Sequence, residues 1–232
     1  MIEKLLNRNS VRKFTAQEIE ASQINTLKEV INASPTTMNL QSFSAIFVTD
    51  PTTRDALMKL NWNQPHVGQA PLIIVFVADL NRLETAAHMH NVESTKEWDG
   101  YVTATIDATI ASACAMSAAI DMGLGTCYIG GLRWNSEATN KLLNIEGDAS
   151  VVLGLIVGYE DGKSVHRPKI NKVYDAKYDL KAIKEELQQY DILMQNYYKT
   201  VFNKDTTFTK VSTESLGKIE SSYTPNNKKS FK

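Results

Sequence analysis

The sequence of 232 residues contains only two cysteines, Cys114 and Cys127, and they do not form a Cys-x-x-Cys pair. Both have apolar surroundings, so we expect buried thiols rather than a disulfide or a metal site, in keeping with a reducing, cytoplasmic compartment. Neither sign of charge dominates, because 25 basic residues are balanced by 26 acidic ones. A nucleic-acid-binding protein normally needs a strongly basic face, so we expect no nucleic-acid partner.

The chain also lacks the uninterrupted apolar run that a membrane span requires. The best candidate, Tyr101 to Met122, contains Asp107 and repeated Thr and Ser residues, and it has no basic flanks. We therefore expect a buried helix of a soluble domain and no membrane partner. The first residues, Met1 to Asn7, include Glu3 and Lys4 and do not resemble a signal peptide.

Two common signatures of nucleotide binding are missing, since there is no Gly-x-Gly-x-x-Gly after a strand and no Walker sequence. Two separated clusters of cations are present instead. Arg8 to Phe14 contains three cations and Ser10, a set suited to holding a phosphate through charge-assisted hydrogen bonds. Arg167 and Lys169 form a second pair around Pro168. Either cluster alone is explained by a solvated basic turn, but the two together indicate one polyanionic ligand.

A hydrophobic content of 43% is enough for one sizeable core. The spacing of apolar residues predicts helices at Gln17 to Ala33, Pro51 to Leu60, Tyr101 to Met122, Ser136 to Leu143 and Asp179 to Tyr198. Apolar and β-branched runs predict strands at Ser44 to Thr49, Pro71 to Ala78, Cys127 to Gly131 and Val151 to Gly158. The second and fourth runs are continuously apolar, which predicts a central sheet covered on both faces.

Two regions have weaker patterns. Asn81 to Asp99 lacks clear periodicity and contains His88 and His90, so we interpret it as an excursion or a lid over a site. After Phe202 the chain is rich in Lys, Ser, Thr and Asn, which favours a segment that wraps a surface over one that forms core. We expect one domain over 1–200 and a C-terminal extension over 201–232 that packs on the domain or on a partner subunit.

Paired glycines, Gly130 and Gly131, follow the strand expected at Cys127. Bare backbone at the end of a strand allows a flat ring system to approach closely. A tight turn before the helix expected at Ser136 explains the pair equally well, so the glycines alone do not decide between the two.

Four segments together match the motifs of one protein family. Arg8 to Phe14 is similar to the family's His-Arg-Ser-x-Arg-x-Phe/Tyr, and Pro35 to Gln41 resembles its Ser/Thr-rich loop before a Leu-Gln pair. Gln64 to Ala70 resembles its Gln-x-His-Val-x-Gln-Ala segment, and Gly123 to Arg133 matches Gly-Leu-Gly-x-x-Tyr-Ile-Gly-Gly-Leu-Arg. The chain thus resembles the flavin-dependent nitroreductases over nearly its whole length, within them the NADPH-linked oxygen-insensitive nitroreductases and FMN reductases.

The resemblance implies an α+β fold, in which a central mixed, mostly antiparallel sheet is flanked by helices, and an intertwined homodimer with FMN in each of two interface sites. It implies that Arg8 to Arg12 and Lys169 hold the FMN phosphate and ribityl chain. Arg167 would lie near N1 and O2 of the ring as the catalytic residue, in a segment where the family has Lys-Pro-Arg. The implied cofactor-binding residues, part of them from the second subunit, are Arg8, Asn9, Ser10, Val11, Arg12, Thr36, Thr37, Met38, Gln64, Tyr128, Ile129, Gly130, Gly131, Arg167 and Lys169.

The implied reaction is a ping-pong cycle. NADPH or NADH delivers a hydride to FMN, and a small acceptor such as a nitroaromatic, a quinone or a free flavin then takes two electrons. A guanidinium beside N1 and O2 stabilises the charge of the reduced ring. Hydride transfer needs no general base, so we interpret His66 and His166 as structural. Asp99 matches an acidic position near the family's site, or it caps the helix expected at Tyr101.

Two departures from the family pattern leave alternatives open. The NADPH-linked relatives have an arginine-rich loop after the long late helix, whereas Val201 to Asp205 contains one cation, so the choice between NADPH and NADH is open. Arg8 and Asn9 replace the family's histidine and first arginine, which gives some support to a flavin-binding redox sensor without turnover. The other alternative is a flavin reductase that supplies reduced FMN to a partner enzyme.

Overall fold

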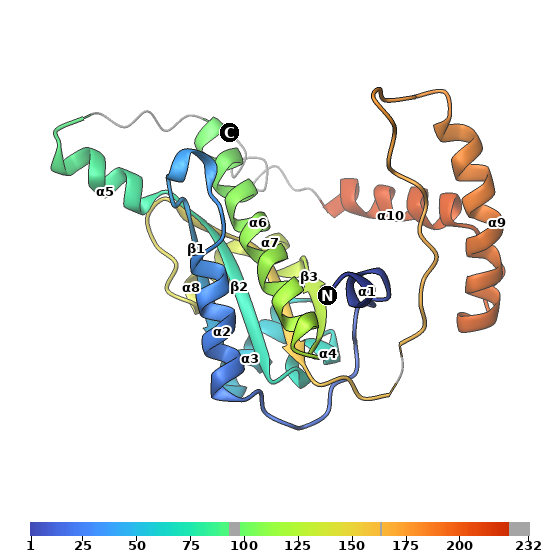
Figure 1. Ribbon diagram of the computed structural model, residues 1–232, viewed down its shortest axis with the longest axis horizontal. Coiled ribbons are helices and arrows are strands. Elements are labelled where there is room, and N and C mark those ends of the chain that lie inside the picture. Colours follow the sequence, from blue (N-terminus) through green and yellow to red (C-terminus); the bar gives the residue numbers. More distant parts are fainter. Residues whose placement is uncertain (93–97, 163, 223–232) are drawn as a thin grey trace. The chain divides into compact units, whose positions relative to one another are not determined.

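A computed structural model describes residues 1–92, 98–162 and 164–222 (Figure 1). The chain divides into two compact units, Met1–Ser164 and Val165–Lys232. The first unit contains the whole sheet and nearly all of the residues for which the sequence predicts chemistry. The second unit contains the two long C-terminal helices.

The sheet has four antiparallel strands in the order β1-β2-β4-β3. Ile46, Val75, Gly154 and Ile129 lie in register across it, one on each strand. Every residue of β2 is buried, which confirms the predicted central strand. The bounds are β1 Phe43–Val48, β2 Leu72–Asp79, β3 Gly125–Ile129 and β4 Ala149–Gly158, close to the four predicted runs.

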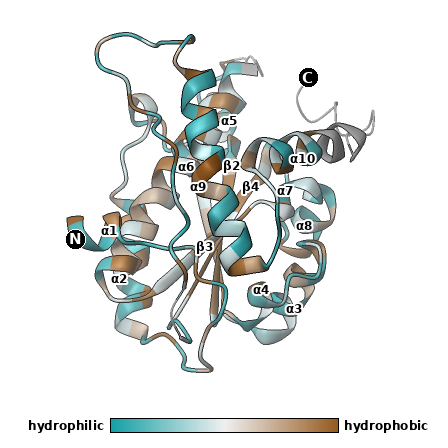
Figure 2. Cartoon of the chain, turned by 90° about the vertical axis from the view of Figure 1, so that its right-hand side faces the viewer, coloured by the Kyte–Doolittle hydropathy of each residue, from teal (hydrophilic) through white to brown (hydrophobic). Residues whose placement is uncertain are grey.

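Helices cover both faces of this sheet, and the apolar strands lie between them (Figure 2). One face is covered by α2 (Ala21–Asn32) and α6 (Trp98–Asp121). The opposite face is covered by α3 (Pro51–Leu60), α4 (Pro65–Gln69), α7 (Gly131–Trp134) and α8 (Ser136–Leu142). Shorter elements are α1 (Ile2–Leu6), the 3₁₀ turn η1 (Thr37–Asn39) and α5 (Asn81–Met89). The predicted α+β class with a mostly antiparallel sheet is therefore confirmed.

Helix α6 crosses the sheet and supplies a face of small side chains to the core. Its fully buried alanines recur every three or four residues, at Ala104, Ala108, Ala111, Ala115 and Ala119. Within the described residues, Asp99–Asp121 is the one helix long and apolar enough to cross a membrane by length and composition. Because its alanine face packs on the sheet, the prediction of a core helix is confirmed.

The structure corrects two predicted helix starts and one predicted excursion. Helix α2 begins at Ala21 rather than Gln17, because Glu20 and Gln23 form a capping box. Asn81–Met89 is helical and not an irregular excursion; its Leu83 packs against the core, while 93–97 lie outside the described residues. The long late helix α9 begins at Ile183 and not at Asp179.

The second unit consists mainly of α9 (Ile183–Phe202) and α10 (Phe208–Ser222). The rings of Tyr190 and Phe208 meet edge to face with 5.0 Å between centroids. Asp191 accepts a hydrogen bond from the Thr209 backbone N–H at 2.8 Å. The segment after Phe202 therefore contains a helix, which the polar composition did not predict. This helix packs on α9 through Phe208, and Asp191 caps its first turn.

Candidate functional site

The cationic segment near the N-terminus is fixed along the outer edge of β3. Ser10 forms a parallel bridge with Thr126, and the Val11 N–H donates to the Thr126 carbonyl at 2.9 Å. Val11 is buried against Gly125, where a Cβ would lie 2.9 Å from its Cγ2. Phe14 forms a second bridge with Glu160. Main-chain pairing therefore holds this segment independently of its side chains.

Arg8, Ser10 and Arg12 are exposed, whereas Val11 between them is buried. Burial raises the pKa of the Cys127 thiol, while the charge of Arg12, a hydrogen bond with Ser10 and the charge of Arg8 act in the opposite direction. The main-chain bridge of Ser10 and the hydrogen bond of Val11 place the segment with both guanidinium groups and the hydroxyl beside β3. The structure thus brings together the three side chains for which the sequence predicts phosphate binding, and leaves them open to solvent.

Asn9 and Tyr128 are engaged with the rest of unit 1. The Asn9 Nδ2 donates to the Ser164 carbonyl at 3.4 Å, which ties the cationic segment to the turn after β4. Tyr128 is 39% exposed, and its hydroxyl accepts a hydrogen bond from Ser112 Oγ of α6 at 3.2 Å. Burial raises the pKa of Tyr128, and the Ser112 hydrogen bond and the charge of Arg8 act to lower it. Ile129 is buried, so only its backbone is available to a ligand.

The two glycines after β3 face different surroundings. A Cβ built on Gly130 would meet nothing within 4 Å. Gly131 is buried, and a Cβ there would overlap the Asn61 side chain, with Cγ at 2.8 Å. Open space beside bare backbone is therefore found at Gly130, and close packing against Asn61 is found at Gly131.

Gln64 lies near these glycines on the face covered by α3 and α7. It is the N-cap of α4 and is half-buried. Its Oε1 accepts a hydrogen bond from Asn61 Nδ2 at 3.1 Å. Because Asn61 also contacts Gly131, it links Gln64 to the end of β3.

The loop with Thr36, Thr37 and Met38 is held by Asp107, a fully buried carboxylate of α6. Asp107 Oδ1 accepts from both the backbone N–H and the hydroxyl of Thr37 at 2.9 Å. Its Oδ2 accepts from Ser42 Oγ at 2.7 Å. Met38 is 87% exposed at a φ of 49°, a left-handed conformation that costs energy for a residue with a Cβ. The buried carboxylate thus fixes a loop that presents Met38 to its surroundings.

The predicted cofactor-binding residues of unit 1 lie at two opposite edges of the sheet. The loop of Thr36 to Met38 leads into β1, which is one edge strand. The cationic segment lies beyond β3, the other edge strand, and Gln64 is linked to that side through Gly131. Four strand spacings of about 4.8 Å separate β1 from the cationic segment, on the order of 19 Å across the sheet. Helix α6 connects the two sides, since Asp107 holds the loop and Ser112 donates to Tyr128.

Arg167 and Lys169 belong to the second unit, and both are exposed. The Arg167 guanidinium lies 5.5 Å from the centroid of the Tyr197 ring on α9. The carbonyl of Pro168 accepts a hydrogen bond from the Tyr190 hydroxyl at 2.8 Å. Helix α9 therefore holds the segment that contains the second cation pair.

Two other sequence predictions concern acidic and imidazole groups. Asp99 is exposed in the first turn of α6, which begins at Trp98, so its interpretation as a cap before Tyr101 was wrong. His66 is half-buried; burial and the charge of Arg12 lower its pKa. In the described residues, no group of His, Cys, Asp and Glu side chains is arranged to hold a metal ion, and both cysteines are free thiols.

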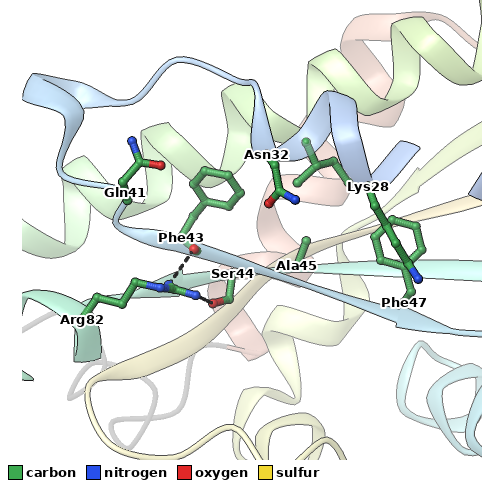
Figure 3. Close-up of a pocket in the computed structure, with 9 residues that line it drawn as sticks. Lys28, Asn32, Gln41, Phe43, Ser44, Ala45, Phe47 and Arg82 are labelled. Atoms are coloured by element: carbon green, nitrogen blue, oxygen red, sulfur yellow. Dashed lines mark hydrogen bonds between the residues drawn. The ribbon is translucent and has the colours of Figure 1, made fainter. Parts of the chain in front are cut away.

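A cavity of about 360 Å³ lies at the β1 edge, between this strand and α2 (Figure 3). Arg82 donates to the Phe43 carbonyl and to Ser44 Oγ, each at 3.0 Å, and Lys28 lies over the Phe47 ring. Its lining residues include none of the predicted cofactor-binding residues. Arg82 and Lys28 are engaged with β1, whereas Gln41 at the cavity wall donates to Thr36 Oγ1 at 3.1 Å, so the cavity adjoins the loop of Thr36 to Met38.

Two residues that organise the site were missed by the sequence reasoning. Asp107 was noted only as an interruption of an apolar helix, and Asn61 was not noted. A lone carboxylate within a helix of small residues was the available signal for Asp107, because such a group needs partners when buried. Nothing in the local sequence marks Asn61.

Comparison with known proteins gives consistent matches. The model of the Nitroreductase family matches residues 5–159. The chain is 32% identical over 206 residues to FMN reductase (NADPH) of Bacillus subtilis, covering 85% of this chain and 83% of that protein. The solved NfrA1 nitroreductase of B. subtilis is similar with a TM-score of 0.88 and 29% identity, over 93% of this chain and 92% of that one. NADPH:FMN oxidoreductase of Vibrio harveyi, solved in complex with NAD⁺, matches with a TM-score of 0.82 and 29% identity, over 93% and 90% of the two chains.

Proposed function

Since this chain belongs to the nitroreductase family, we propose that it is an FMN-dependent oxidoreductase that uses NADPH to reduce nitroaromatics, quinones or flavins. Its similar relatives are named as an NADPH-dependent FMN reductase, a nitroreductase and an NADPH:FMN oxidoreductase. The observation that carries the proposal is the pair of exposed guanidinium groups of Arg8 and Arg12, which main-chain pairing holds beside β3.

The residues at this edge fit FMN. Arg8, Ser10 and Arg12 provide the charge-assisted donors that a phosphate requires. Gly130 leaves open space beside backbone, which suits a planar ring, and Gln64 offers an amide to the polar edge of such a ring. When bound, FMN supplies the redox chemistry, because it takes two electrons from the nucleotide and passes them to the acceptor.

The residues of the chain bind and orient the reactants. Arg8 and Arg12 neutralise the phosphate and concentrate anions at this edge. Gly130 has no side chain, so a planar ring can lie directly against its backbone. Gln64 fixes the orientation of that ring by hydrogen bonding. From the sequence resemblance, we retain Arg167 as the residue that stabilises negative charge at N1 and O2 of the reduced ring. None of these roles requires a general base.

We propose a homodimer whose two sites each combine the β3 edge of one copy with the β1 edge of the other. A second copy would supply the Thr36 to Met38 loop that one copy holds on the far side of its sheet. Helix α6 supports this, since Ile106 and Ile110 are 49% and 37% exposed and form an apolar stripe away from the core. Among the described residues, β1 pairs with no strand other than β2, so a strand of a partner could be added at its outer edge. The free thiols fit a cytoplasmic location.

Steady-state turnover tests the function. We expect purified protein with FMN to oxidise NADPH when a quinone or a nitroaromatic is supplied, and the same assay with NADH measures the nucleotide preference. Faster turnover with free FMN than with a quinone would favour the flavin reductase that supplies a partner. Bound FMN with no NADPH or NADH oxidation in the presence of any acceptor would favour the redox-sensor alternative.

We expect bound FMN to raise the pKa of His66. Burial and the charge of Arg12 lower this pKa below its usual 6.5, so the neutral imidazole contributes stability above pH 6.5 that is lost as the pH falls through the folded-state pKa. A phosphate dianion on Arg12 would offset the repulsion from Arg12, so the pKa of His66 should be higher in the FMN complex than in the apoprotein. NMR titration of the imidazole signals with and without FMN measures both values, and His88, His90 and His166 serve as internal controls. An unchanged His66 pKa would place the phosphate elsewhere.

A further inference from the structure

Among the described residues, Asn61 is the one with a buried side-chain oxygen that lacks a hydrogen-bond partner. It directly follows α3 and is 1% exposed. Its Nδ2 donates to Gln64 Oε1, while its Oδ1 lies against Gly131. A buried amide that makes only this side-chain hydrogen bond is costly, because the unpaired oxygen has lost its water. Because the unpaired oxygen destabilises the folded protein, we infer that Asn61 has a role beyond packing.

The contact with Asn61 decides which end of the Gln64 amide faces outward. Since Oε1 is turned toward Asn61, Nε2 is at the other end of the planar group. No hydrogen-bond partner of Nε2 is found within the described part of the chain, and Gln64 is half-buried rather than enclosed. Gln64 therefore offers N–H donors to a ligand at this edge.

The backbone between the two residues is unusual. Trp62 and Asn63 both have left-handed conformations, with φ of 56° and 52°, and Trp62 is 58% exposed. A left-handed conformation costs energy for a residue with a Cβ, and an exposed ring makes few packing contacts that would offset this cost. Hydrogen bonds around the loop must therefore hold it. The Asn63 N–H donates to the Met58 carbonyl at 3.1 Å, and the Gln64 N–H donates to the Asn61 carbonyl at 3.3 Å. The loop thus turns Gln64 back onto Asn61.

Gly131 completes the arrangement. A Cβ at this position would lie 3.2 Å from the Asn61 Cα and would overlap the Asn61 side chain. Asn61 occupies the space that a side chain at position 131 would need, which explains why Gly131 is a glycine. The space beside Gly130 is open and available to a ring. Asn61 joins the loop before α4 to the end of β3.

We propose that Asn61 is a positioning residue of the FMN site: it fixes the Gln64 amide so that only N–H donors face the cofactor. The acceptor atoms on the polar edge of the ring are the partners that this orientation suits. The inference rests on the proposed function, because it assigns Asn61 a part in FMN binding. Asn61 acts through Gln64 and does not itself contact the cofactor.

A double-mutant cycle on FMN affinity tests this role, with flavin fluorescence quenching on the apoprotein as the readout. We expect Asn61→Ala to weaken FMN binding about fivefold to tenfold, the effect of one neutral hydrogen bond and its lost orientation. The same substitution in a Gln64→Ala background should change the Kd less than about twofold, because the group that Asn61 orients is gone. A purely structural role would weaken binding equally in both backgrounds.

Two further variants separate orientation from packing. Gln64→Glu keeps an oxygen for Asn61 Nδ2 but presents a carboxylate oxygen in place of Nε2, so we expect FMN binding to weaken at least about tenfold. Asn140→Ala is the control, since the Asn140 Oδ1 on α8 accepts a hydrogen bond from the Val151 backbone N–H at 3.1 Å and lies outside the proposed site. Asn140→Ala should lower the melting temperature and leave the FMN Kd unchanged.

Two outcomes would overturn the assignment of Asn61. One is an equal loss of FMN affinity from Asn61→Ala with and without Gln64, and the other is wild-type affinity in Gln64→Glu. Failure of the unsubstituted protein to bind FMN would instead overturn the proposed function, and this inference with it. The apoprotein melting temperature distinguishes these results from simple unfolding.

Discussion

Arg12→Ala is expected to weaken FMN binding about 100-fold, as the loss of two hydrogen bonds from a guanidinium to a phosphate would predict. The variant should fold normally, because Val11 and Ser10 hold the segment through main-chain pairing with Thr126 and the Arg12 side chain is exposed. Flavin fluorescence quenching on the apoprotein measures the Kd, and circular dichroism checks the fold.

Two matched variants make this result specific. Arg12→Lys keeps the charge but loses the planar fork, so an intermediate Kd is expected. Lys13→Ala removes the adjacent exposed cation and should change the Kd less than about threefold. Equal losses from Arg12→Ala and Lys13→Ala would show that general positive charge, and not a phosphate site at Arg12, accounts for binding.

Asp107→Ala is expected to lower the free energy of unfolding by about 3 kcal/mol, since three donors of the Thr37 and Ser42 groups lose their buried acceptor. For a chain of this size, the melting temperature should fall by about 6 to 12 °C. Asp107→Asn keeps one acceptor oxygen and should lose roughly half as much. A melting temperature unchanged in Asp107→Ala would show that the loop of Thr36 to Met38 is held by other contacts.

The same two positions test whether the sites are shared between subunits. Arg12→Ala damages the β3 edge, and Asp107→Ala damages the β1 edge, so each homodimer should have two defective sites. In a heterodimer of the two variants, one site would receive both defects and the other would receive none. Co-expressed heterodimers should therefore recover about half of the wild-type FMN binding. No recovery would mean that each site is built from a single copy.

Much of the fold could be predicted from the sequence, because its strongest patterns are local. The apolar run that forms β2 is continuous. The helix predicted after Asp50 begins at Pro51, and the Asp50 side chain caps it by accepting a hydrogen bond from the Thr53 N–H at 2.7 Å. The start of α2 was missed because a capping box moved it to Ala21. Helix α10 was missed because its composition is mostly polar; its first residue, Phe208, packs on Tyr190 of α9.

The grouping of the candidate site residues was predictable where motifs are contiguous, and their roles stay predictions. Arg8 to Arg12 and Gly130 are short segments whose residue types carry their chemistry, and the structure brings them to one edge of the sheet. Asp107 carried only the general signal of a lone carboxylate, because its partners are 70 and 65 residues away and are chosen by packing. Asn61 was not predictable, because its contact with Gly131 depends on how α3 packs against the end of β3. The separation of the Thr36 to Met38 loop from this edge also depends on strand order, which no local pattern encodes.

An absorbance spectrum of the purified protein with FMN, recorded before and after anaerobic addition of NADPH, tests the central claim most directly. The account predicts flavin bands that bleach with NADPH and return when a quinone is added, and a parallel sample with NADH compares the nucleotides. Flavin bands that persist with both nucleotides would contradict an oxidoreductase function while leaving the binding site intact. Flavin that does not remain with the protein through gel filtration would contradict the site itself.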